Sequence, residues 1–208
     1  MVEPGGAQGL VTRVREVLRP LAQGADLRET LEEAFGVICD VSGCESVGIR
    51  WKSGDDYPYL VTRGFGRDFV VVEGPLCVRD AAGLILRHRD GTPQLACLCG
   101  AVIQGRTDPS QPFFTEGGSF WTSGSTILLK DTPPRAVAAI TTRNYCNAVG
   151  YESVALIPLR AGERIYGLLQ LNSRQPGRFT EQRIEEYERV ARGIARAVAK
   201  RGGDLPVS

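Results

Sequence analysis

The sequence predicts an α+β fold, in which helices at both ends of the chain enclose strand-forming segments. Two patterns indicate this. Apolar residues recur at three- and four-residue steps near both termini, as they do along one face of an α-helix. Near the C-terminus two short apolar segments, ESVALIPL and RIYGLLQL, are joined by the turn RAGE, which is typical of a β-hairpin.

The N-terminal part of the chain should form two helices. The first covers residues 9–21, and Pro20 should end or kink it because proline cannot continue a helix. The second covers residues 25–41. Asp26 can cap this helix, and Glu29 stands three residues further on, as in a capping box.

Short apolar segments bounded by turn residues indicate the strands. They are expected at residues 45–51, 57–63, 152–159 and 164–171. Thr180 is a good N-cap, and apolar residues at helical spacing predict a last helix from there to about Lys200. Between the two strand groups, residues 65–150 show weaker periodicity, and a segment of that length inside a domain usually has a function.

Composition narrows the class of protein. The chain has 208 residues, 42% of them hydrophobic and 24% charged, with a formal net charge of +1, which is ordinary for a globular domain. No basic tract suited to a phosphate backbone is present, so we do not expect nucleic-acid binding. No apolar run approaches the ~20 residues of a membrane span, and the N-terminus lacks a signal-peptide pattern. We therefore expect a cytoplasmic protein without membrane contact, whose thiols stay reduced.

Long stretches of the sequence resemble the GAF domain family. The C-terminal run SVALIPLRAGERIYGLLQLNSRQPGRFTEQRIEEYERVARGIARAV is similar to the closing strands and helix of such domains, and residues 25–41 followed by ESVGIRW are similar to their opening. The central runs CLCGAVIQGRTDPSQPFFTEGGSFWT and RNYCNAVGYESVALIPL resemble a subgroup found in bacterial sensory proteins, with a Cys-x-Cys-Gly motif.

This resemblance implies an antiparallel sheet flanked by the N- and C-terminal helices, with the long central segment forming a pocket. It divides the chain into an extension with a helix (1–24), the GAF domain (25–200) and a disordered tail (201–208). It also implies a role in signal transduction without intrinsic catalysis. The signal would pass to a protein partner, and the terminal helices are suited to forming a homodimer.

Six cysteines occur, and four of them lie in the central segment: Cys77, Cys97, Cys99 and Cys146. Four thiolates can bind a zinc ion or an iron–sulfur cluster, so we expect these residues to hold one such centre. The spacing is one Cys-x-Cys pair plus two single residues, which differs from the usual paired Cys-x-x-Cys of zinc sites. Gly100 after the pair would suit a tight turn. Two other interpretations stay open, namely four buried apolar side chains or a redox thiol pair.

Aromatic and hydroxyl residues around PFFTEGGSFWT predict a small-molecule pocket, because such pockets are apolar with a few placed polar groups. The expected lining residues are Phe113, Phe114, Thr115, Glu116, Ser119, Phe120, Trp121, Arg143 and Asn144. Alternatively, the aromatic rings only fill the core. The single histidine, His88, lies in a polar turn, so a Ser-His-Asp or Cys-His catalytic pair is not expected.

Three functions are consistent with these patterns. The first is a stand-alone sensory module with a four-cysteine metal or iron–sulfur centre. The second is a thiol-dependent reductase of free methionine sulfoxide, an activity that some stand-alone GAF domains have. The third is a metal-free module that binds a small organic effector. We expect the first, and assign no catalytic residue.

Overall fold

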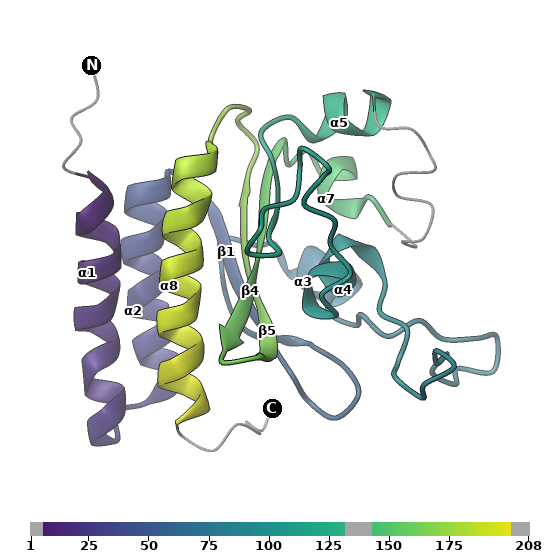
Figure 1. Ribbon diagram of the computed structural model, residues 1–208, viewed down its shortest axis with the longest axis horizontal. Coiled ribbons are helices and arrows are strands. Elements are labelled where there is room, and N and C mark those ends of the chain that lie inside the picture. The colour runs from purple at the N-terminus through teal and green to yellow at the C-terminus, as the bar shows by residue number, and fades with distance from the viewer. Residues whose placement is uncertain (1–5, 132–142, 201–208) are drawn as a thin grey trace.

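In the computed structural model, residues 6–131 and 143–200 are described. They form a five-stranded antiparallel sheet with long helices on one face and short helices and loops on the other (Figure 1). The predicted α+β class is therefore confirmed. The expected tail 201–208 lies outside the described residues.

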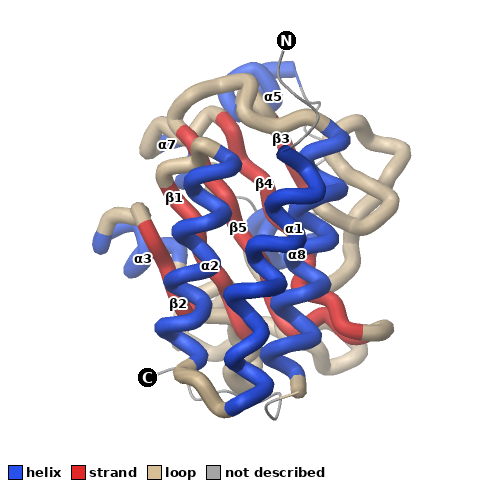
Figure 2. Tube along the Cα trace, turned by 90° about the vertical axis from the view of Figure 1, so that its left-hand side faces the viewer, coloured by secondary structure: helices blue, strands red, loops and turns tan. Residues whose placement is uncertain are grey.

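The helical layer contains α1 (Gly6–Leu18), a short 3-10 helix η1 (Arg19–Gln23), α2 (Leu27–Ser42) and α8 (Glu181–Ala199). Pro20 lies at the start of η1, so α1 ends where the sequence predicts. The caps are also as expected, because the side chains of Asp26 and Thr180 accept hydrogen bonds from the first turns of α2 and α8. Figure 2 shows α1 between α2 and α8, on the side away from the strands, and α1 contacts both of them.

The sheet has the strand order β2-β1-β5-β4-β3. Its strands are β1 (Ser46–Trp51), β2 (Tyr59–Arg63), β3 (Phe120–Thr122), β4 (Ser153–Ala161) and β5 (Arg164–Ser173). β4 and β5 form the predicted hairpin, and β1 and β2 match the two predicted N-terminal strands. The short β3 pairs with β4 and comes from the central segment, where no strand was expected.

Side chains alternate between the two faces of the sheet, and the register separates two hydrophobic cores. Val47 and Ile49 of β1, and Leu169 and Leu171 of β5, face the helical layer and belong to the larger core. The intervening residues of the same strands face the central segment. That segment and the second face of the sheet enclose a smaller core of their own.

The central segment contributes α3 (Arg67–Glu73), α4 (Cys97–Ile103), α5 (Ser125–Asp131) and α7 (Tyr145–Ala148), which cover this second face (Figure 1). Phe113, Phe114 and Phe120 pack their rings together in the smaller core, with centroids 5.0 to 6.0 Å apart. These rings therefore belong to the smaller core. Within the described residues no helix is long and apolar enough to cross a membrane.

Candidate functional site: a three-thiol cavity

A cavity of about 80 Å³ lies between the second face of the sheet and the short helices that cover it. β3 and β4 form its floor, and α4, α5 and α7 form its walls. Its lining residues are Glu73, Cys97, Leu98, Cys99, Phe120, Thr122, Ser125, Leu128, Leu129, Asn144, Tyr145, Cys146, Asn147, Val154 and Leu156. Three thiols, those of Cys97, Cys99 and Cys146, thus share one largely apolar cavity and come from two separate helices. We call it the three-thiol cavity.

Cys97 is held in an unusual conformation at the first residue of α4. Its backbone φ of +62° is in the left-handed region, which residues other than glycine rarely adopt. The surrounding contacts must therefore hold the backbone in this conformation. Its Sγ accepts two hydrogen bonds from Arg143, at 3.2 Å from the backbone nitrogen and 3.5 Å from Nε. Gly100 is a helix residue and not the expected tight turn; a Cβ there would lie 2.5 Å from the Cβ of Leu95.

Cys99 and Cys146 are less suited to ionise than an exposed thiol. Burial raises the pKa of Cys99, and burial together with the nearby Glu73 carboxylate raises the pKa of Cys146 to about 12. The amide Nε2 of Gln170 lies 3.8 Å from the Cys146 sulfur. Both thiols are therefore protonated at neutral pH.

Arg50 lies beneath this region and is fully buried on β1. Its guanidinium donates hydrogen bonds to the carbonyls of Tyr57 (3.2 Å), Gly74 (2.9 Å) and Glu73 (2.7 Å). It also lies over the ring of Tyr59, 3.8 Å from the centroid. A buried charge needs such partners, and here two of the three carbonyl groups lie at the C-terminal end of α3.

Arg143 is the second arginine at the end of α3. Its terminal nitrogens donate to the carbonyls of Val72 and Pro75, both at 2.8 Å, and its Nε lies 3.5 Å from Oε1 of Glu73. Burial alone would lower the pKa of Arg143, but the contact with Cys97 and the charge of Glu73 together raise it. One guanidinium therefore joins a cavity thiol, a buried carboxylate and the end of α3.

The fourth predicted ligand, Cys77, does not line the three-thiol cavity. Its Sγ lies 3.2 Å from the carbonyl oxygen of Asp55, and burial and the charges of Asp56 and Asp55 raise its pKa to about 11. Within the part of the chain that is described, no group of three or more His, Cys, Asp or Glu side chains is placed to hold a metal ion. The arrangement thus brings together three of the four cysteines, and the four-thiolate centre stays a prediction.

The residues predicted to line a pocket lie in several places. Phe120 and Asn144 line the three-thiol cavity, and Arg143 contacts one of its thiols. Trp121 packs against the larger core on the opposite face of the sheet, since it follows Phe120 along β3. Glu116 is exposed.

Two further predicted pocket residues hold a loop instead. Thr115 and Ser119 donate hydrogen bonds from their hydroxyls to Oε1 of Glu188 on α8, at 2.6 and 2.7 Å. Their role in this structure is to fasten the loop before β3 to the helical layer.

The sequence interpretation did not single out the buried polar residues Arg50, Glu73, Gln170 and Asn172. The sequence did contain a signal. Arg50 on β1, and Gln170 and Asn172 on β5, are polar residues within apolar strands, and the register places all three on the same face of the sheet. Gln170 accepts a hydrogen bond from the Tyr59 hydroxyl at 2.9 Å and donates one to Asn172 at 3.1 Å. Polar residues at alternate positions of a strand indicate a polar face under a covering segment.

Comparison with known proteins agrees with this architecture. The family model for the GAF domain matches residues 26–198. The chain belongs to the GAF family. A search of curated proteins found no match. Solved structures show the same fold at low sequence identity, which makes this GAF protein similar to them in fold alone.

Three of these structures illustrate the range. The GAF domain of an Acinetobacter phosphoenolpyruvate-protein phosphotransferase aligns with a TM-score of 0.58 at 12% identity, covering 95% of this chain and 97% of that one. A free methionine-R-sulfoxide reductase from Neisseria meningitidis gives 0.58 at 14%, covering 96% and 93%. A protein from Burkholderia vietnamiensis described as a GAF sensor gives 0.57 at 16%, covering 95% and 99%.

Proposed function

We propose that this GAF protein is a sensory module that receives its signal at the three-thiol cavity and passes the change to a protein partner. The observation that carries the proposal is the position of Cys97, Cys99 and Cys146 around one cavity. The two sequence segments that supply these thiols, CLCG and RNYCNAVG, are also those that resemble the sensory subgroup. Thiols react with oxidants and soft metals, so the signal is of that chemical class.

The contacts of Arg143 suggest how a change at the cavity would spread. Its guanidinium contacts Cys97, the carboxylate of Glu73 and two carbonyls at the end of α3. Oxidation of Cys97 would add oxygen to the sulfur that Arg143 now contacts and would change its size and charge, so the present contact could not be kept unchanged. The contact between α3 and the start of α4 would then loosen.

A metal or iron–sulfur centre is the more specific form of this proposal. The donor chemistry is suitable, because sulfur ligands select zinc and iron–sulfur clusters. The present arrangement does not fit a four-thiolate set, since Cys77 lies against Asp55 outside the cavity. If a centre binds, we expect the three cavity thiols to be its ligands.

The test is anaerobic purification followed by measurement of metal, sulfide and the absorption spectrum, before and after a titrated oxidant. Hydrogen exchange of residues 67–75 reports the state of α3. We expect metal, or an oxidant-dependent rise in exchange, in the wild type and in the control Cys44→Ser, whose thiol is buried under the helical layer. Cys97→Ser should abolish both. A metal-free wild type that does not respond to oxidant would contradict the proposal.

A second candidate is thiol-dependent reduction of free methionine sulfoxide, favoured by three thiols in one cavity of a GAF fold. In that chemistry one thiol takes the sulfoxide oxygen to become a sulfenic acid and releases methionine. A second thiol then forms a disulfide with loss of water, and an external dithiol restores both. Cys97 is the cavity thiol in contact with a cation, which suits the attacking group. Turnover of free methionine sulfoxide that depends on dithiol and is lost in Cys97→Ser would establish it.

A further inference from the structure

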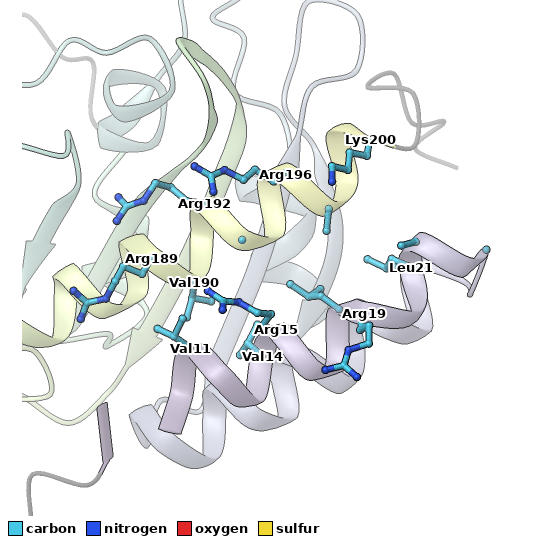
Figure 3. Close-up of a pocket in the computed structure, with 15 residues that line it drawn as sticks. Val11, Val14, Arg15, Arg19, Leu21, Arg189, Val190, Arg192, Arg196 and Lys200 are labelled. Carbon is cyan, nitrogen blue, oxygen red and sulfur yellow. The ribbon is translucent and has the colours of Figure 1, made fainter. Parts of the chain in front are cut away.

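A large groove runs between α1 and α8 (Figure 3). These helices cover the face of the sheet opposite the one that carries α4, α5 and α7 (Figure 1). Its volume is about 1010 Å³. The apolar lining residues are Val11, Val14, Leu18, Leu21, Ala22, Val190 and Ala197. The charged lining residues are Arg15, Arg19, Arg189, Arg192, Arg196 and Lys200. We call this the basic groove, since every charged residue that lines it is a cation.

Within residues 6–131 and 143–200, five of these six cations have no carboxylate at ion-pair distance. Among the described residues only Arg192 has one, Glu188, at a distant 3.9 Å, and this carboxylate already accepts the hydroxyl hydrogen bonds of the loop before β3. The six basic residues are exposed, while the whole chain has a net charge of only +1. The basic groove is therefore a local concentration of positive charge, which attracts anions and speeds their association.

The cations on α8 form a stripe along one side of that helix. Arg189, Arg192, Arg196 and Lys200 follow one another at three- and four-residue steps along α8, a stripe about 16 Å long at the rise of an α-helix. Figure 3 shows these side chains extending from α8, with Arg15 on α1 and with valines of both helices between the two axes. An apolar floor between charged edges is the form of surface that binds an amphipathic helix.

We propose that the basic groove binds an acidic amphipathic helix of a partner protein. The partner's apolar residues would cover Val11, Ala22 and Ala197, the apolar lining residues that keep exposed surface. Its carboxylates would pair with the arginines on both edges. A second copy of this chain is a poor occupant of the groove itself, because two basic grooves facing each other would bring cations against cations. A homodimer through the terminal helices would therefore use other surfaces of these helices. Duplex nucleic acid and a flat lipid surface would leave the recessed apolar floor uncovered.

Charge-reversed proteins test this proposal directly. The probe is a fluorescent synthetic peptide of about 15 residues, with leucines at helical spacing and glutamates on both flanks. We expect the wild type to bind it with an affinity that weakens between about 50 mM and about 300 mM salt. The variant Arg189→Glu/Arg192→Glu/Arg196→Glu should weaken binding about tenfold or more, since each reversed charge repels the peptide. Arg13→Glu, an exposed change on α1 outside the groove, should leave binding unchanged.

Further arms separate the alternatives. Val11→Asn replaces a partly exposed apolar residue of the groove floor and should also weaken binding of the peptide. If the peptide bound through its charges alone, this variant would bind it as well as the wild type. A peptide of the same composition with its leucines out of register should not bind. Equal binding of that peptide, or groove-dependent binding that is tighter to phosphatidylglycerol vesicles or duplex DNA, would overturn the proposal. So would a dimer in sedimentation experiments that the groove variants dissociate. None of these results depends on what the three-thiol cavity binds.

Discussion

The buried guanidinium of Arg50 offers the most direct test of how the central segment is held on the sheet. In Arg50→Met the side chain keeps an unbranched apolar stem, but the carbonyls of Tyr57, Glu73 and Gly74 each lose a charged donor at 2.7 to 3.2 Å. A buried carbonyl left without its donor costs about 1–3 kcal/mol, so three of them cost about 3–5 kcal/mol, toward the lower end of that range because the substitution also removes a buried charge. Losing the contact with the Tyr59 ring costs about 1 kcal/mol more. Apolar burial of methionine returns about 1 kcal/mol. We expect a loss of about 4 kcal/mol in the free energy of unfolding.

The assay is urea unfolding followed by circular dichroism, at neutral pH with a reductant present. Arg50→Lys keeps the charge but lacks the planar fork that reaches three carbonyls, so we expect it to recover only about half of the loss. Arg13→Met removes an exposed arginine and should cost under about 0.5 kcal/mol. If Arg50→Met costs no more than Arg13→Met, the carbonyl contacts do not stabilise the fold and the reasoning is refuted.

Three further changes test other contacts. Burial raises the pKa of Cys146 to about 12, above its unfolded value of about 9, so the unfolded chain loses this proton first as pH rises. The free energy of unfolding of the wild type should therefore fall by about 2 kcal/mol more than that of Cys146→Ala by about pH 10.5, and parallel curves would contradict the shift. Gly64→Ala should lower the free energy of unfolding by about 3 kcal/mol or more, because φ is +79° and a Cβ would lie 1.8 Å from the carbonyl oxygen of Glu45. The control Gly54→Ala also has a positive φ but lies in open space, so it should cost about 1 kcal/mol in the same urea assay. Glu188→Ala removes two hydroxyl hydrogen bonds and should raise hydrogen exchange in the loop before β3, at a cost of about 2 kcal/mol; unchanged exchange would show that the loop is held by other contacts.

Much of the fold could be predicted from the sequence because its signals are local. The caps Asp26 and Thr180 lie next to the helices that they begin, and Pro20 acts on the helix that it interrupts. The hairpin of β4 and β5 follows from two apolar segments and a short turn. Each of these features depends on residues within a few positions of one another, where intrinsic preferences of the chain decide the structure.

The candidate site required contacts between distant residues. By itself the sequence determined the three long helices, four of the five strands of the described sheet, the GAF resemblance and the concentration of cysteines in the central segment. Only the tertiary structure separated Cys77 from the three cavity thiols and placed Arg143 on Cys97, 46 residues away along the chain. It also brought Arg50 to the end of α3 and gathered the cations of α1 and α8 along one groove. The physical reason is that such neighbours are set by how whole elements pack: local spacing can mark Arg50 or the cations of α8 as unusual, but it does not show which distant residues they meet.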